Sequence, residues 1–241
     1  MYEPRVLQKG PFRIGEIAVV TCGEPWRANP QYDALVGPAW QARMEAEAVH
    51  GRRMWDGVYY RLKDLSPFEP PGTAAYRLGT VSYRYAATYR ALHEAHAALG
   101  LEPLYHLTTA TLIRTGDGHY LFGQRGNGSV DLIGGGVQPE ELAVSSGADL
   151  ERNLHKEVFE EVGIPETALA GLEGRGVLMS TTSNILIIAE VATSLTRGAA
   201  EDAFTRRAED EMVAPVFVPA AELPSFLRRL TDYRSLIPDL L

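Results

Sequence analysis

Three glutamates lie close together in one short segment of the sequence. Glu157, Glu160 and Glu161 are spaced i, i+3 and i+4, so a helix through them places their carboxylates on one face. Adjacent carboxylates repel one another unless a cation lies among them, and such hard oxygen ligands suit Mg²⁺ or Mn²⁺, which also bind phosphate oxygens. A run of glutamates is, however, more often the solvated face of an amphipathic helix. The spacing alone leaves both interpretations open.

The segment around these glutamates has a strong helical pattern. Four aliphatic residues recur every four positions and form an apolar stripe: Leu150, Leu154, Val158 and Val162. Gly163 suits a left-handed C-terminal cap, and Pro165 prevents the helix from continuing. Ser146 and Asp149 can form a capping box at the other end. The pattern predicts a helix that ends at Val162.

A cluster of glycines lies upstream of this helix. Gly134, Gly135 and Gly136 follow a predicted strand, and glycine lets a backbone approach a ligand closely. Gly135 and Gly136 are therefore candidate substrate-binding residues. A glycine cluster combined with a carboxylate helix favours a site where metal ions bridge phosphate oxygens.

These residues together resemble the box of the Nudix hydrolase superfamily. That box reads glycine, five residues, glutamate, seven residues, then R-E-U-x-E-E-x-G-U, where U is a bulky aliphatic residue. Residues 156–164 match the second half at every position except the first, and five residues separate Gly135 from Glu141. The resemblance covers about 104–230. It implies an Mg²⁺-dependent pyrophosphatase (Mn²⁺ being an alternative) whose metal ligands are Glu157, Glu160 and Glu161.

Three departures from the family box concern the site. Lys156 replaces the arginine that orients the catalytic carboxylates in the family, and Ile133 stands where a proline commonly precedes the glycines. Fourteen residues, in place of seven, separate Glu141 from Lys156. The longer segment leaves the role of Glu141 open and makes Glu140 an equal candidate.

The catalytic roles follow from the same resemblance. It assigns them to Lys156, Glu160 and Glu161. The base that activates water stays open between Glu160 and a glutamate of a distant loop, either Glu209 or Glu211.

The first hundred residues carry a less specific resemblance. Residues 39–43, 59–62 and 76–84, with 131–135 downstream, are similar to the Nudix branch that hydrolyses UDP-glucose and UDP-galactose. In that branch a W-x-x-R helix, an F-R-L strand and an R-L-G-x-T-S-Y-R segment precede the box. The resemblance implies UMP and a sugar 1-phosphate as products.

Aromatic and cationic residues near predicted strand ends are further candidates. An arginine at a strand end can clamp phosphate or stack on a base, so Tyr83, Arg84 and Arg125 are candidate substrate-binding residues. Trp40, Tyr59 and the remaining aromatic side chains of this region are more simply explained by core packing.

The elements that must position these residues form a mixed pattern. Strands are predicted over 12–22, 57–62, 76–83, 106–114, 120–124, 130–133 and 213–218, with one or two more in 177–192. Helices are predicted over 31–49, 86–99 and 223–230, in addition to the helix that ends at Val162. Turns are predicted at 66–72 and 115–118. Strands and helices without strict alternation favour an α+β fold. With the resemblance, this predicts a Nudix-type α/β/α sandwich over 103–241. Residues 1–102 form an N-terminal α+β extension, whose small core requires docking on the sandwich.

Composition restricts the function classes. The 241 residues carry 23 Lys and Arg against 31 Asp and Glu, a formal charge of −8, so the chain as a whole does not attract nucleic acid or an anionic membrane surface. The single cysteine, Cys22, excludes an internal disulfide and a cysteine-rich zinc site. Neither a signal peptide nor an apolar run of spanning length is visible, so we expect a cytoplasmic protein with a small-molecule nucleoside diphosphate substrate. Nothing in the sequence indicates an oligomeric state.

Two alternatives stay open. The substrate can be ADP-ribose or another nucleoside diphosphate derivative. The chain can also be a catalytically weak regulator that binds nucleotide sugars, since the superfamily includes binding modules. Lys156 and Ile133 favour a regulator, whereas the three intact glutamates favour an enzyme.

Overall fold

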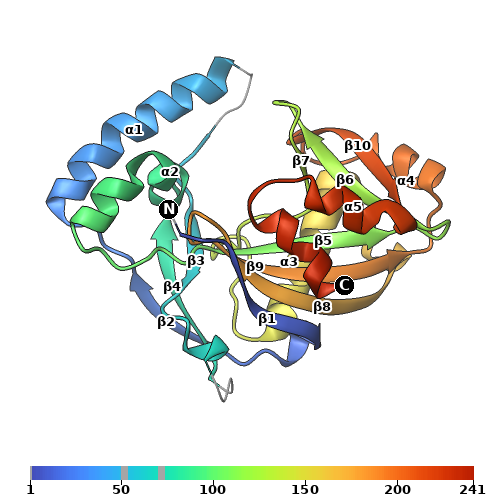
Figure 1. The fold of residues 1–241 in the computed structure, drawn as a ribbon, viewed down its shortest axis with the longest axis horizontal. Coiled ribbons are helices and arrows are strands. Elements are labelled where there is room, and N and C mark those ends of the chain that lie inside the picture. Colours follow the sequence, from blue (N-terminus) through green and yellow to red (C-terminus); the bar gives the residue numbers. More distant parts are fainter. Residues whose placement is uncertain (1, 50–53, 70–73) are drawn as a thin grey trace.

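The chain folds around two β-sheets that lie side by side (Figure 1). The computed structural model describes residues 2–49, 54–69 and 74–241. The larger sheet has seven strands in the order β1-β8-β9-β5-β6-β10, with β7 paired to β6, and the smaller sheet has the order β2-β4-β3. Within these residues the predicted α+β fold class is confirmed.

The elements have the following bounds. The strands are β1 (Arg5–Phe12), β2 (Val19–Pro25), β3 (Val58–Leu62), β4 (Tyr76–Ser82), β5 (Leu107–Arg114), β6 (His119–Arg125), β7 (Val130–Asp131), β8 (Leu169–Met179), β9 (Ile185–Thr193) and β10 (Met212–Pro219). The α-helices are α1 (Pro30–Val49), α2 (Tyr83–Ala98), α3 (Gly147–Val162), α4 (Arg197–Phe204) and α5 (Leu223–Arg228). Five 3-10 segments complete the fold: Ile14–Glu16, Ser66–Phe68, Glu166–Ala168, Ala220–Glu222 and Asp232–Leu240.

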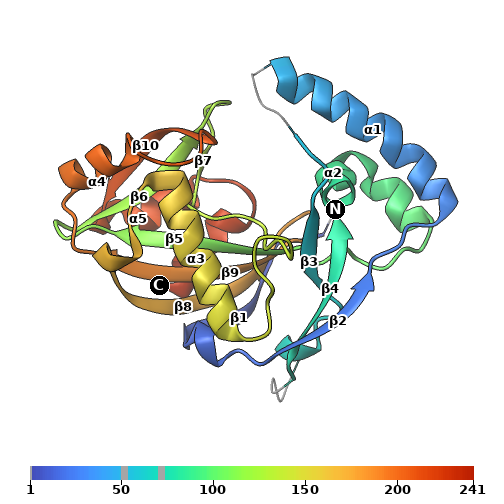
Figure 2. The same cartoon turned by 180° about the vertical axis from the view of Figure 1, so that it is seen from behind.

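Helices cover both faces of the larger sheet (Figures 1 and 2). On one face, Val158 of α3 and Ala203 of α4 pack with Ile113 and Val191 of the sheet. On the other face, α5 and the C-terminal 3-10 segment 232–240 bury aliphatic side chains against the sheet. Alternating side chains of the strands thus supply two cores, and the result is an α/β/α sandwich.

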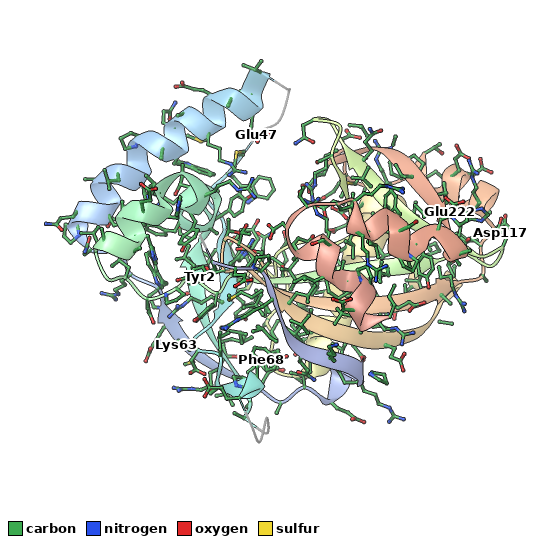
Figure 3. The ribbon with its side chains drawn as sticks, viewed as in Figure 1. Tyr2, Glu47, Lys63, Phe68, Asp117 and Glu222 are labelled. Atoms are coloured by element: carbon green, nitrogen blue, oxygen red, sulfur yellow. The ribbon has the colours of Figure 1, made fainter. Side chains whose placement is uncertain are left out.

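The smaller sheet lies between two further cores. On one face, α1 and α2 bury a cluster rich in aromatic residues: Trp26, Tyr32, Val36, Tyr59, Val81, Tyr85, Tyr89 and Leu104. On the other face, Leu62 and Leu78 share a core with Leu107 and Val177 of the larger sheet. Phe68, labelled in Figure 3, packs at the edge of this shared core. The two sheets therefore stabilise each other by common apolar burial.

The predicted strand over 12–22 is wrong. Residues 5–12 form β1, an edge strand of the larger sheet paired with β8, whereas Val19–Pro25 form β2 in the smaller sheet. The 3-10 turn Ile14–Glu16 separates them. Ile14 and Ile17 continue the apolar β-type pattern through this turn because both pack in the shared core, and the sequence pattern could not show the break.

Other elements differ from prediction mainly at their ends. Helix α2 begins three residues earlier than expected, so Tyr83 and Arg84 lie in its first turn and not at a strand end. The stretch 177–192 belongs to two long strands, β8 and β9, joined by a turn. The proline-rich turn predicted over 66–72 is a 3-10 turn at Ser66–Phe68, and its remainder from residue 70 lies outside the described residues.

Candidate active site on helix α3

Helix α3 holds the predicted glutamates in a fixed orientation because both of its ends are capped. At the start, the carboxylate of Asp149 accepts hydrogen bonds from the N–H groups of Ser145 (2.7 Å) and Ser146 (2.9 Å). At the end, Gly163 adopts φ +71° and its N–H donates to the carbonyl of Phe159 at 2.9 Å. The predicted cap residues are confirmed.

Two of the three glutamates are buried on the side of α3 that faces the sheet. Glu157 is 7% exposed and Glu161 1%. Glu161 accepts a hydrogen bond from the N–H of Gly134 at 2.8 Å. Burial raises the pKa of Glu157 to about 7, and burial, followed by the nearby Glu211 and Glu157, raises the pKa of Glu161. A solvated face does not explain these two residues.

Lys156 lies among the carboxylates. Its Nζ is 2.6 Å from Glu141 Oε2, 2.9 Å from Glu160 Oε2 and 3.5 Å from Glu157 Oε1. The pKa of Lys156 is raised, although its partial burial opposes the shift, because hydrogen bonds to Glu141 and Glu160 stabilise the charged form. The lysine thus contacts three carboxylates at once, as a single point of charge.

Glu140 and Glu141 differ in their contacts with the glutamate cluster. Glu141 reaches Lys156, whereas no contact of Glu140 with the cluster is seen in the described part of the chain. The segment between Glu141 and α3 packs on the extension: the hydroxyl of Thr21 donates to the carbonyl of Val144 at 2.8 Å, and the N–H of Val144 donates to Tyr60 Oη at 3.2 Å. The additional residues therefore join the glutamate helix to the smaller sheet.

The glycine cluster packs directly against the site. A Cβ on Gly135 would lie 2.5 Å from Glu157 Oε2, and a Cβ on Gly136 would lie 2.4 Å from Tyr59 Cδ1. Real Cβ atoms do not approach neighbours this closely, so a Cβ on Gly136 would displace the Tyr59 ring and one on Gly135 would displace the carboxylate of Glu157. The glycines let the backbone touch a site glutamate on one side and the extension on the other.

Tyr59 and His106 are neighbours of the site that the sequence did not single out. Tyr59 lies on β3, its ring 5.1 Å from that of Tyr83 and 5.1 Å from that of His106. Burial, with the charges of Glu141 and Glu157 among the further causes, raises the pKa of Tyr59. The signal for Tyr59 was present in the Tyr-Tyr-Arg-Leu segment, but an aromatic residue in a strand is ordinarily core.

Arg125 and the glutamates of the 209–211 loop border the other side of the cluster. Arg125 pairs with Glu211, and its Nε lies 3.4 Å from Asp131 Oδ2. The N–H of Glu209 donates to the carbonyl of Glu160 at 3.0 Å, so this loop is attached to α3. Both predicted distant glutamates thus lie near the helix.

Tyr83 and Arg84 separate at the start of α2. Tyr83 packs between Tyr59 and Trp40, and the charges of Glu211 and Arg125 act on it. The side chain of Arg84 lies 3.6 Å from Asp56 and donates to Tyr85 Oη at 3.1 Å. Tyr83 therefore faces the site, whereas the guanidinium of Arg84 is engaged with its own extension.

The carboxylates of the cluster are suitable ligands for a divalent metal, but they do not converge on one point. Within the described residues, no three His, Cys, Asp or Glu side chains are placed to hold a metal ion together. The ammonium of Lys156 supplies positive charge among the carboxylates instead. Burial raises the pKa values of Glu157 and Glu161, and a hard divalent cation bound beside them would favour their charged forms.

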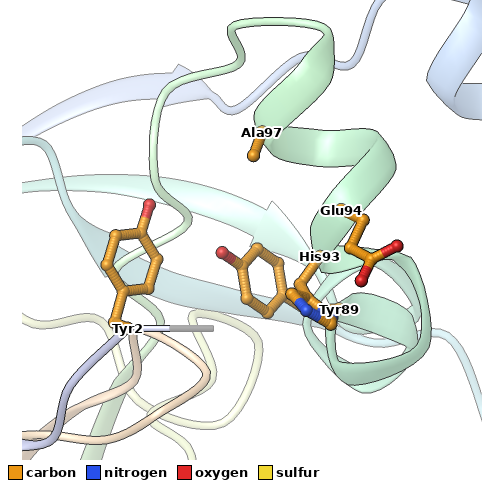
Figure 4. Close-up of a pocket in the computed structure, with 5 residues that line it drawn as sticks. All are labelled: Tyr2, Tyr89, His93, Glu94 and Ala97. Carbon is orange, nitrogen blue, oxygen red and sulfur yellow. The ribbon is translucent and has the colours of Figure 1, made fainter.

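Two further findings do not involve the predicted site residues. A cavity of about 340 Å³ on α2 is lined by Tyr2, Tyr89, His93, Glu94 and Ala97 (Figure 4), none of them a predicted site residue. None of the described helices has the length and apolarity that a membrane crossing requires.

Comparisons with known proteins concern the fold. Neither family models nor curated proteins match the chain. Similar solved structures include Tm1382, a candidate Nudix hydrolase (17% identity, 66% of this chain and 83% of that chain, TM-score 0.44), and the MutT protein of Methanosarcina mazei (20%, 58% and 95%, 0.40). The Nudix domain of Shewanella oneidensis NrtR, complexed with ADP ribose, is a third (16%, 55% and 86%, 0.35). At these identities the similarity bears on the fold alone, so the chemistry is argued from this chain's residues.

Proposed function

We propose that this chain is a metal-dependent hydrolase that cleaves the diphosphate of a nucleoside diphosphate derivative. The observation that carries the proposal is the burial of Glu157 and Glu161 against a glycine backbone, beside Glu160 and Lys156. Buried carboxylates cost free energy unless a ligand or a reaction requires them. In this proposal the glycine backbone beside these carboxylates contacts the phosphate chain.

Glu157, Glu160 and Glu161 would hold the metal, which supplies Lewis-acid polarisation of phosphoryl oxygens when bound. Lys156 contacts the carboxylates of Glu141, Glu160 and Glu157, and its charge offsets their mutual repulsion. The base that activates water stays open among Glu160, Glu209 and Glu211, because all three side chains reach solvent. Arg125 and the backbone of Gly135 and Gly136 would bind the phosphates.

We propose UDP-glucose or UDP-galactose as the substrate, cleaved to UMP and a sugar 1-phosphate. The resemblance of the extension to the corresponding Nudix branch supports this choice. Tyr83 supports it as well, because its ring lies among the aromatic side chains of the extension at the site and can stack on a base or a sugar. Arg84 contributes to the pocket in this proposal only if it leaves Asp56, with which it pairs.

The test is a panel of UDP-glucose, UDP-galactose, ADP-ribose and dinucleotides, each incubated with Mg²⁺ or Mn²⁺ and analysed by product chromatography. Hydrolysis that is lost in Glu161→Gln and kept in Glu201→Gln, an exposed glutamate of α4, supports the metal-dependent enzyme. Preferred cleavage of ADP-ribose would replace the UDP-sugar assignment. Tight binding of a nucleotide sugar without turnover would instead identify a regulator.

A further inference from the structure

A network of partly buried polar groups connects the C-terminal segment to Arg125. The guanidinium of Arg125 contacts two carboxylates, those of Glu211 and Asp131. Glu211 lies on an exposed loop, whereas the side chain of Asp131 is only 20% exposed. Asp131 is the more buried of the two partners, and it contacts Nε of the guanidinium, whereas Glu211 contacts Nη1.

Asp131 is itself held by groups from two parts of the chain. Its Oδ1 accepts hydrogen bonds from Tyr233 Oη and from the N–H of Leu132, both at 3.0 Å. Its other oxygen, Oδ2, is the one that faces Arg125 Nε. Arg234 Nη1 also lies 3.6 Å from Oδ1. With these groups on the Oδ1 side, Oδ2 is the oxygen that faces Arg125.

The hydroxyl of Tyr233 is buried, and its position is fixed by the residues around it. Burial and the neighbouring Asp131 raise the pKa of Tyr233. Next to it, Asp232 has φ +61°, and its carboxylate accepts hydrogen bonds from the N–H and the hydroxyl of Thr181 at 3.0 and 3.1 Å. Arg234 donates to the carbonyl of Val130 at 3.0 Å. These contacts join the end of the chain to the β8–β9 turn and to β7 (Figure 1).

We propose that Tyr233 is a positioning residue for substrate binding: through Asp131 it holds the guanidinium of Arg125 in the direction needed to meet the phosphates. The inference rests on the proposed function, since it takes Arg125 as a phosphate ligand. A guanidinium binds phosphate through two parallel donors and so depends on its orientation. Loss of the Tyr233 hydroxyl leaves Asp131 with one donor fewer and lets both side chains turn.

The test is a double-mutant cycle read by steady-state kinetics with the preferred substrate of the panel. Tyr233→Phe removes only the hydroxyl and should raise KM about 5- to 10-fold, the effect of one hydrogen bond, with kcat within about twofold. In an Arg125→Ala background the same change should have no effect on KM. Tyr120→Phe is the matched control, because Tyr120 Oη also donates to a carboxylate, Glu190 at 2.8 Å, away from Arg125.

An unchanged KM in Tyr233→Phe, or an equal rise with and without Arg125, would overturn the inference. If Tyr233→Phe lowers the melting temperature, Asp131→Asn is the second variant. Its KM should rise to a similar extent, and Tyr233→Phe should then add nothing; additive effects would again overturn the inference.

A failure of the proposed function is distinguishable from a failure of this inference. If the native chain hydrolyses nothing on the panel, the proposed function fails. Binding of α,β-methylene-UDP, measured by calorimetry, then tests the positioning role alone. Weaker binding by Tyr233→Phe that disappears in the Arg125→Ala background supports the inference, and equal binding by all four proteins overturns it.

Discussion

Replacing Glu157 by glutamine should stabilise the metal-free protein, and only at neutral to alkaline pH. The pKa of Glu157 is about 7 in the folded chain, with burial as the largest cause, against the ordinary value of 4.5 for an exposed glutamate. The charged carboxylate is thus disfavoured in the folded state. Because the folded-state pKa is raised, protonation of Glu157 contributes to the free energy of unfolding. This contribution is complete below about pH 4.5 and is lost as the pH rises through 7.

The size of the effect follows from the same two values. A difference of about 2.5 units at about 1.4 kcal/mol each corresponds to roughly 3 kcal/mol, most of it lost between pH 5 and pH 8.5. Glutamine carries no charge at any pH and keeps nearly the same volume. For a chain of this length, roughly 3 kcal/mol corresponds to about 5–10 °C in melting temperature.

The assay is thermal unfolding in EDTA at pH 5 and pH 8.5. Glu157→Gln should melt well above the native protein at pH 8.5 and close to it at pH 5, whereas Glu201→Gln on the exposed side of α4 should follow the native protein at both. Added Mg²⁺ should then raise the melting temperature of the native protein more than that of the variant. A stability gain that is the same at both pH values would refute the assignment of a buried, strained carboxylate.

Three further outcomes are expected. Lys156→Arg should keep activity and Lys156→Ala should lose at least about 10-fold in kcat/KM, because only a cation can hold the neighbouring carboxylates; equal activity of the alanine variant would contradict this. Gly136→Ala should lower the melting temperature, since its Cβ would lie 2.4 Å from the ring of Tyr59, whereas Gly198→Ala, with open space on α4, should not. Asp149→Ala should cost about 1 kcal/mol in urea unfolding at pH 7. Because the pKa of Asp149 is lowered by hydrogen bonds from Ser145, the gap between native protein and variant should shrink as the pH falls below 4.

The sequence indicated helix α3 and its caps well, because the evidence is local. An apolar stripe with a repeat of four, a glycine at the end and Ser146 with Asp149 at the start depend on residues within one helix. The conformation of 12–22 was not predictable in the same way. Its apolar residues pack on the same core on both sides of the 3-10 turn, and only the distant strands β8 and β4 decide where each half pairs.

The site was predicted where it depends on α3 and missed where it depends on tertiary contacts. The contact between Lys156 and Glu141 bridges an irregular segment, whose path is set by packing on Tyr60 and Thr21. Tyr59 looked like an ordinary core residue, and it is buried, but its ring packs on the glycine cluster. Tyr233 is far from Asp131 in sequence, and no spacing rule connects the two.

The pairing of β1 with β8 changes how the extension must be regarded in protein engineering. The chain starts in the larger sheet, leaves it for β2 to α2, and returns at β5, so this region is an internal insert held by two connections. A shortened chain starting at residue 103 would lose β1 and leave the edge of β8 open to pairing with another copy. An excision that keeps both β1 and the 3-10 turn Ile14–Glu16 preserves that edge and the contact of this turn with α3, where the N–H of Gly15 donates to Glu151 at 2.8 Å. Such an excision measures the contribution of the insert separately from damage to the sheet.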